Sequence, residues 1–201
     1  MLRWDTGNQV LRIHRLVRDV IRERQPDEQR SVILQSALLM VYNYLPDDPP
    51  PHDVRSWPIW ETMVAHVRTL IAEAVQARIG QPTSRMADEL AVFIAQKSLW
   101  PEAETLARLA LKIDEQILGP EHPRVARDLN NLAALLLATN RLAEAEPLRR
   151  RCLQIVAEFG RRTGHEHPRF STAINTYAGL LAAMGLNEQE IRDRVRSALR
   201  I

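Results

Sequence analysis

Residues 123–155 read PRVARDLNNLAALLLATNRLAEAEPLRRRCLQI, and this stretch decides the fold. Apolar residues recur in it at steps of three and four, first in one segment and then, after a short turn, in another. In the first segment they are Val125, Leu129, Leu132 and Leu136, and in the second Ala145, Leu148, Cys152 and Ile155. Such spacing places the apolar side chains on one face of a helix. The stretch therefore predicts a helix-turn-helix unit.

This unit recurs on both sides. Shifting the chain by 42 residues superimposes residues 90–113 on residues 132–155, with nine identical pairs that include Glu104/Glu146 and Arg108/Arg150. Shifting it by 45 residues superimposes residues 119–124 on residues 164–169 and continues through Asn130/Asn175. The difference of three residues falls in the turn at residues 160–163, where an insertion is easily accommodated.

A repeat of this length is typical of a solenoid, in which each unit buries its apolar face against the next. Proline and glycine clusters divide the chain into nine expected helices. These are Val10–Arg24, Asp27–Tyr44, Pro58–Ile79, Ser84–Lys97, Pro101–Leu118, Pro123–Thr139, Leu142–Gly160, Pro168–Met184 and Glu188–Leu199. We predict an all-α protein, with an N-terminal helical region over residues 1–82 and repeats ending in a capping helix over residues 83–201.

Composition narrows the functional classes. The formal net charge is only +2, and most arginines have an acidic residue within one helical turn, which disfavours nucleic acid as a partner. Cys152 is the only cysteine, so no intrachain disulfide can form. Neither a signal peptide nor an apolar run long enough to span a membrane is present. We expect a cytoplasmic protein that makes no membrane contact.

The repeat motifs resemble a known family. The motif at residues 129–133, LNNLA, is followed by NRLAEAE at residues 140–146 and preceded by LGPEHP at residues 118–123. Together they resemble the long tetratricopeptide repeats of kinesin light chains and of many bacterial regulators, and the likeness extends over about residues 85–185. The resemblance implies a right-handed superhelical array of antiparallel helix pairs. In the third unit, Glu190 stands where Ala103 and Ala145 stand in the others, which suggests a degenerate terminal cap.

A second, shorter resemblance concerns the N-terminal part. Residues 13–22, IHRLVRDVIR, with Trp57-Pro58 and His66, resemble the junction that follows the winged-helix region in bacterial NB-ARC-type (STAND) signalling ATPases. In that family such repeats form the C-terminal sensor, and the ATPase carries a P-loop. The motif G-x-x-x-x-G-K-[ST] does not occur in this sequence.

The tetratricopeptide resemblance implies a concave groove lined by the first helix of each pair. Its positions fall on nine residues: Arg85, Asp88, Glu89, Arg127, Asn130, Asn131, Thr172, Asn175 and Thr176. An asparagine amide can donate to a peptide carbonyl and accept from a peptide N–H, so it can hold an extended chain regardless of its sequence. The alternative is that these asparagines only satisfy turns or neighbouring helices.

Other motifs give weaker indications. His122, His165 and His167 could suggest a metal, but such a site needs three or four convergent ligands, and both Glu-His-Pro triplets fall at a repeat junction where proline is expected for structural reasons. No serine lies in a Gly-x-Ser-x-Gly elbow, and Cys152 fills the place of Ala110 in the preceding repeat, which favours a packing role. Arginines 149–151, 161 and 162 form the best basic cluster, although three consecutive helical residues cannot share one face. The tryptophans at 57, 60 and 100 are expected to anchor the N-terminal helices to the repeats, and the alternative is a patch that binds a partner.

We therefore expect a non-catalytic scaffold, without cofactor or metal, that binds a protein or peptide in the groove. It would be the sensor or regulatory region of a signalling ATPase system. The alternative is a helical repeat that binds nucleic acid through its arginines. An incompletely capped solenoid could also associate end to end.

Overall fold

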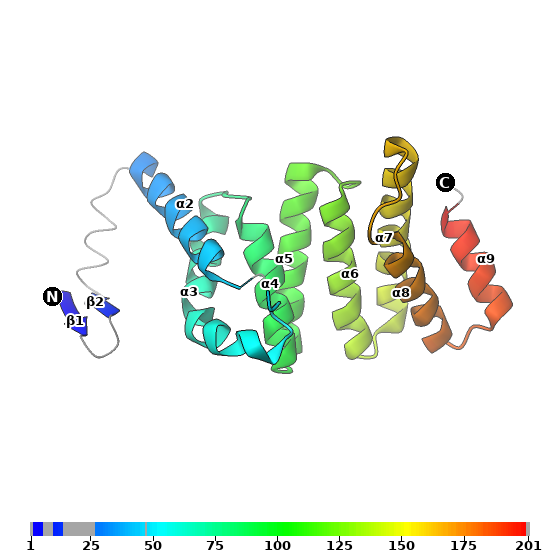
Figure 1. Cartoon of the computed structure of the whole chain (residues 1–201), viewed down its shortest axis with the longest axis horizontal. Coiled ribbons are helices and arrows are strands. Elements are labelled where there is room, and N and C mark those ends of the chain that lie inside the picture. Colours follow the sequence, from blue (N-terminus) through cyan, green and yellow to red (C-terminus); the bar gives the residue numbers. More distant parts are fainter. Residues whose placement is uncertain (1, 6–9, 14–26, 47, 200–201) are drawn as a thin grey trace.

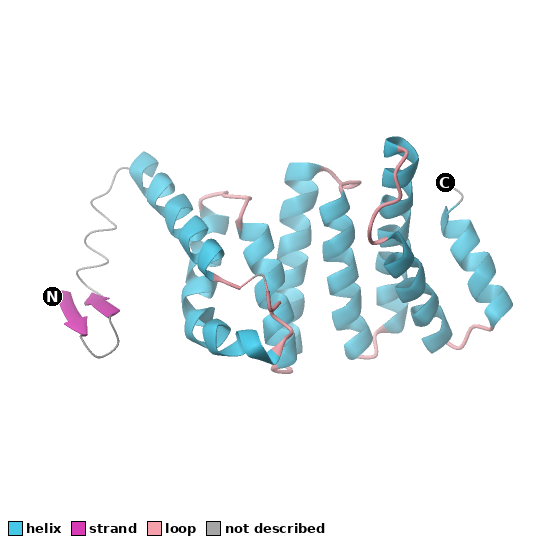
Figure 2. Ribbon diagram, viewed as in Figure 1, coloured by secondary structure: helices cyan, strands magenta, loops and turns pink. Residues whose placement is uncertain are grey.

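The computed structural model describes residues 2–5, 10–13, 27–46 and 48–199, and shows a row of helices stacked side by side (Figures 1 and 2). Two short strands, β1 and β2, precede eight helices, α2 to α9, and a 3-10 turn, η1, among these residues. Their bounds are β1 Leu2–Asp5, β2 Val10–Ile13, α2 Asp27–Tyr44, η1 Val54–Ser56, α3 Trp57–Gln76, α4 Thr83–Gln96, α5 Trp100–Leu118, α6 Pro123–Ala138, α7 Leu142–Thr163, α8 Phe170–Ala183 and α9 Glu188–Leu199.

The structure confirms the eight helices expected from Asp27 onward, to within three residues at each end. The first expected helix, Val10–Arg24, is wrong at its start, because residues 10–13 form β2. This strand pairs antiparallel with β1, with Leu2 opposite Ile13 and Asp5 opposite Val10. Residues 14–24 lie outside the described part of the chain. Periodicity misled here because a short apolar run fits a strand as well as a helix.

Residues with positive φ angles recur at equivalent turns, which shows the repeat in three dimensions. Ser98, Asn140 and Gly185 each end the first helix of a pair, and their φ angles are 60°, 58° and 89°. Gly119 and Gly164 each follow the second helix of a pair, with φ angles of 86° and 71°. A left-handed residue ends a helix cleanly and lets the chain reverse. Helices α4–α5, α6–α7 and α8–α9 therefore form three successive antiparallel pairs.

The first Glu-His-Pro triplet caps a helix, and the second makes the same side-chain contact in the turn that precedes α8. His122 precedes α6, and its Nδ1 accepts a hydrogen bond of 3.1 Å from the backbone N–H of Arg124. His167 repeats this contact with the N–H of Arg169, also at 3.1 Å. A side chain that accepts from a free N–H at the start of a helix stabilises that end. The structure thus gives both histidines a structural task.

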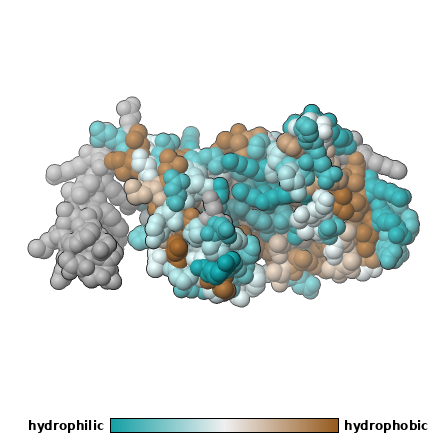
Figure 3. All heavy atoms as spheres, in the orientation of Figure 1, coloured by the Kyte–Doolittle hydropathy of each residue, from teal (hydrophilic) through white to brown (hydrophobic). Residues whose placement is uncertain are grey.

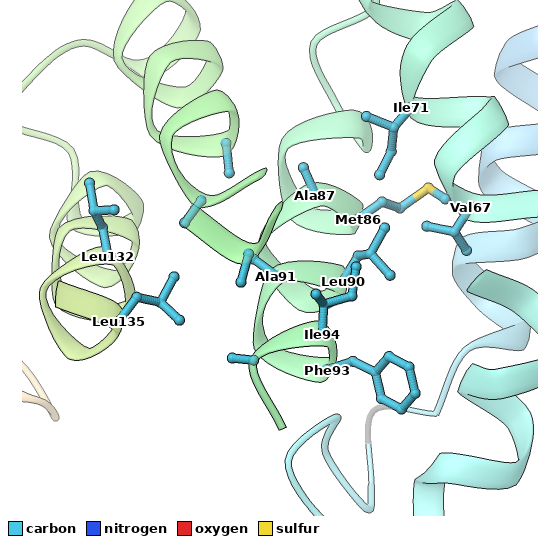
Figure 4. Close-up of a cluster of buried hydrophobic side chains, with 14 of the residues drawn as sticks. Val67, Ile71, Met86, Ala87, Leu90, Ala91, Phe93, Ile94, Leu132 and Leu135 are labelled. Carbon is cyan, nitrogen blue, oxygen red and sulfur yellow. The ribbon is translucent and has the colours of Figure 1, made fainter. Parts of the chain in front are cut away.

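The apolar core consists of two clusters of buried side chains, one centred on α3 to α6 and one on α6 to α9, and α6 contributes to both. In Figure 4, α4 lies between two neighbours: Met86 and Phe93 point toward α3, where Val67 and Ile71 lie, while Leu132 and Leu135 lie on α6. The helices of each pair can approach closely because alanines fill their contact; Ala103, Ala107, Ala110, Ala133 and Ala145 are almost fully buried. Burial of these faces drives the stacking.

Tryptophans fasten α3 to the first repeat. Trp60 is fully buried and stacks on Phe93 of α4, with ring centroids 5.6 Å apart. Trp57 meets the same ring edge-on at 6.4 Å. Aromatic pairs in these geometries contribute beyond their buried area. The N-terminal helix α3 and the repeats thus share one core. Within the described residues, no helix combines the length and the apolar composition needed to cross a membrane.

Candidate partner-binding surface

The first group of predicted groove residues lies at the contact between α4 and α6. Asp88 on α4 is 3% exposed, and its two carboxylate oxygens accept hydrogen bonds of 2.9 and 3.0 Å from Nδ2 of Asn131 on α6. Nε of Arg127 lies 3.4 Å from the same carboxylate. Burial raises the pKa of Asp88, while Arg127 and Asn131 oppose that rise. Asn131 and Arg127 thus stabilise a buried acid and join the first helices of two repeats.

Two further buried acidic residues lie near this contact. Neither was among the site residues predicted from the sequence. Asp114 on α5 is fully buried and accepts a 2.7 Å hydrogen bond from Nε2 of Gln81. Asp128 on α6 is 1% exposed, and its nearest cation is Arg127 at 3.4 Å. Burial, followed by the negative charge of Asp88, raises the pKa of Asp128 to about 8. Asp128 is therefore largely protonated at neutral pH.

A sequence signal for these acids existed. Asp114 follows Ala110 by four residues and Asp128 follows Val125 by three, so each lies in register with a core position of its helix. A charged residue in a core register indicates either a break in the helix or a buried polar site. Here both helices continue, and the acids are buried.

A pocket of about 130 Å³ lies between α6 and α8. Three predicted groove residues, Arg127, Asn130 and Thr172, belong to its wall. The remaining lining residues are Pro123, Ala126, Cys152, Val156, His167, Arg169 and Ala173. Most of the pocket surface is apolar, although half of its lining residues are polar and come from α6, from α8 and from the turn before α8. Figure 3 shows one face of the molecule, on which hydrophilic side chains dominate over α5 and α6.

The remaining four predicted groove residues lie outside both the α4–α6 contact and the pocket. Two of them are on α4 and two on α8. Arg85 pairs with Glu89 on α4 at 2.7 Å, and its guanidinium lies 4.8 Å from the ring centre of Tyr42 on α2. Asn175 is exposed on α8, whereas the hydroxyl of Thr176 donates to its own helix at Ala173. The nine residues therefore form an α4–α6 contact and an α6–α8 pocket, with Arg85 and Glu89 at one end and Asn175 and Thr176 at the other.

The side-chain amides of Asn130 and Asn131 are each hydrogen-bonded through only one of their two polar atoms. Oδ1 of Asn130 accepts from the guanidinium of Arg149 on α7, and no described residue accepts from its NH₂ group. Asn131 has the opposite arrangement, because its NH₂ group donates to Asp88 and its carbonyl oxygen has no donor among the described residues. Both side chains are partly exposed. One amide donor and one amide acceptor thus remain for a ligand, side by side on α6.

The histidine and the cysteine at the pocket do not form a nucleophilic pair. Burial raises the pKa of Cys152 to about 11, which keeps the thiol protonated at neutral pH. Burial also lowers the pKa of His167, whose Nδ1 is already occupied by the N–H of Arg169. In the described part of the chain, no three or more His, Cys, Asp or Glu side chains converge as they would around a metal ion.

The arginine cluster does not form one basic face. Arg149 is 6% exposed and binds Asn130. Arg151 pairs with Glu115 at 2.6 Å, and Arg161 pairs with Glu158 at 2.8 Å. Arg150 and Arg162 are exposed. A phosphate backbone needs several cations along one surface, so this arrangement gives no support to the nucleic-acid alternative.

One family model matches part of the chain. Residues 83–158, which cover α4 to α6 and most of α7, match the family model of the tetratricopeptide repeat. A search of curated proteins found no match. Tetratricopeptide repeats are generally protein-interaction scaffolds, and the matched segment carries both the α4–α6 contact and the α6 side of the pocket.

Proposed function

We propose that the chain is a non-catalytic scaffold whose repeats hold a protein or peptide segment along α4, α6 and α8. The pocket between α6 and α8 is the single observation that carries this proposal. Its apolar lining and volume of about 130 Å³ suit one apolar side chain of the ligand. Its polar rim supplies the groups that would fix the ligand backbone.

The free amide groups give the backbone contacts. The NH₂ group of Asn130 would donate to a carbonyl of the ligand, and the carbonyl of Asn131 would accept from a ligand N–H. Arg149 and Asp88, which bind the other ends of these two amides, hold them in orientation. Pre-oriented groups lose less entropy on binding, so they favour affinity. Recognition would then depend on the backbone and on the side chain seated in the pocket.

The choice of substitutions for a test follows from these contacts. Replacing Arg127 or Asn131 with Ala would remove partners of the buried Asp88 and would destabilise the fold. Thr172 and Asn175 are instead exposed on α8, and Thr172 lines the pocket. They are therefore the better probes of binding.

We expect the double change Thr172→Ala, Asn175→Ala to weaken peptide binding about tenfold, because it removes two polar contacts along α8, one at the pocket wall and one about a turn further on, together worth about 1.4 kcal/mol. The ligands would be peptides selected on the whole chain from a phage-displayed random library, with affinities measured by fluorescence anisotropy. The melting temperature should change by less than about 2 °C, since both side chains are exposed.

The matched control is Thr105→Ala, Gln116→Ala, which removes two exposed polar side chains of α5 outside the pocket. It should leave the affinity unchanged. If the library yields no binders, or if its binders tolerate the α8 changes as well as the α5 changes, the scaffold does not bind through this surface.

We further propose that the scaffold is the sensor end of a cytoplasmic bacterial signalling ATPase system, in which ligand capture is relayed to a nucleotide switch. The resemblance of residues 13–22, Trp57-Pro58 and His66 to the junction of such ATPases supports this context. Reading the gene upstream of Met1 tests it. A P-loop ATPase segment in the same frame or in the adjoining gene is expected, and an unrelated neighbourhood would contradict it.

A further inference from the structure

A second cavity lies at the other side of the last repeat, and it shares no residue with the pocket between α6 and α8. Its volume is about 280 Å³. It is open to solvent on one side, and helices α7, α8 and α9 line it with Arg150, Gln154, Tyr177, Arg194, Ser197 and Ala198. Two arginines, an amide and two hydroxyl groups are thus gathered around one space, and no acidic side chain lines it.

Arg150 does not form the ion pair with Glu146 that its position on α7 would predict. One repeat earlier, the equivalent Arg108 pairs with Glu104 at 2.7 Å, as expected for a Glu and an Arg four residues apart on a helix. Arg150 has the same spacing from Glu146, yet neither Arg150 nor Arg194 lies within 4.0 Å of a carboxylate among the described residues. The same sequence pair therefore behaves differently in the two repeats.

Tyr177 explains this difference. Its hydroxyl donates a 2.7 Å hydrogen bond to Oε1 of Glu146 and so holds that carboxylate away from Arg150. In the preceding repeat the equivalent position is Leu132, which has no group to offer Glu104. Burial and Glu146 raise the pKa of Tyr177, whereas the positive charges of Arg150 and Arg194 lower it, so both guanidinium groups act on the same hydroxyl.

We propose that this cavity binds a phosphate-sized dianion, either inorganic phosphate or a phosphate monoester, between Arg150 and Arg194. Guanidinium groups present planar donor forks that match phosphate oxygens. Gln154 and Ser197 would supply neutral donors to the remaining oxygens. The anion would link α7 to α9, so a phosphorylated ligand would also fasten the terminal helix of the solenoid.

Calorimetric titration of the whole chain with inorganic phosphate at low ionic strength tests the site. Arg150→Ala and Arg194→Ala should each weaken binding about fivefold or more, because each removes a charge-assisted contact. Arg196→Ala is the matched control: it removes the same charge from α9 at an exposed position outside the cavity, and it should change the affinity less than about twofold. O-phosphoserine and adenosine 5′-monophosphate then distinguish a modified protein side chain from a small metabolite as the source of the phosphate.

A second variant tests the role assigned to Tyr177. In Tyr177→Phe, Glu146 is released and should pair with Arg150 as Glu104 does with Arg108, which would lower phosphate affinity about threefold or more. Adding Glu146→Gln removes that competitor and should restore binding. Both variants lack the hydroxyl, so a difference between them cannot come from its loss, and circular dichroism verifies that both are folded.

Three results would overturn the proposal. They are an absence of phosphate binding up to about 20 mM, equal weakening by Arg196→Ala and Arg150→Ala, and an affinity of Tyr177→Phe that Glu146→Gln does not raise. None of them bears on the peptide proposal, which rests on other residues.

Discussion

Replacing Asp128 with Asn is expected to stabilise the protein by about 3 kcal/mol more at pH 9 than at pH 5. Asp128 is buried beside Asp88, and its pKa in the folded protein is raised to about 8 from an ordinary value of 3.8. Between these pH values the folded chain holds a proton that the unfolded chain has lost. Stability therefore falls as pH rises through this window, by up to about 1.4 kcal/mol per pH unit. Asparagine cannot ionise and lacks this dependence.

The expected gain is set below what the full pKa difference would give, because relaxation of the surroundings and water penetration lower the penalty of a buried charge. Urea unfolding followed by circular dichroism at pH 5, 7 and 9 measures the effect. Asp193→Asn provides the control, since it makes the same chemical change at an exposed site of α9 and should alter stability by less than about 0.5 kcal/mol. A variant at position 128 that gains no stability relative to the natural chain between pH 5 and pH 9 would show that Asp128 ionises without cost.

Trp60→Ala is expected to destabilise the whole chain by about 3–5 kcal/mol, the usual range for removing a fully buried large aromatic side chain. The cavity would open between α3 and α4, where Trp60 stacks on Phe93 at 5.6 Å. Because the core continues from there into α6, the loss should appear as one cooperative transition at lower urea concentration with an unchanged slope.

Two related variants make this result specific. Trp60→Phe keeps most of the buried side-chain volume. It should lower the free energy of unfolding by less than half as much as Trp60→Ala. Trp57→Ala affects the same Phe93 ring from a partly exposed position, and it should also cost less. If Trp60→Ala instead produced two transitions, with most of the helical signal unchanged, α3 would be a separate folding unit.

The sequence by itself was sufficient for the helices and for the order in which they stack. Apolar spacing in residues 123–155, together with the positions of glycine and proline, gave eight of the expected helices to within three residues. These signals are local, because a helix depends on the residues within one or two turns. The repeat added the long-range information, since equivalent segments such as LNNLA must pack in equivalent ways. The hairpin of β1 and β2 was missed because strand pairing depends on a partner that periodicity does not reveal.

The candidate site was only partly determined by the sequence. The tetratricopeptide resemblance placed nine residues on the first helices of the pairs, but it could not show which of their polar groups the protein itself uses. Asn131 binds Asp88 across 43 positions of the chain, and Arg149 binds Asn130. Likewise, Glu104 and Glu146 are equivalent in sequence, and only Tyr177, brought in by α8, separates their roles. Hydrogen bonds and ion pairs act over about 3 Å, so only the tertiary structure, which sets distances between helices, decides which polar groups remain free for a ligand.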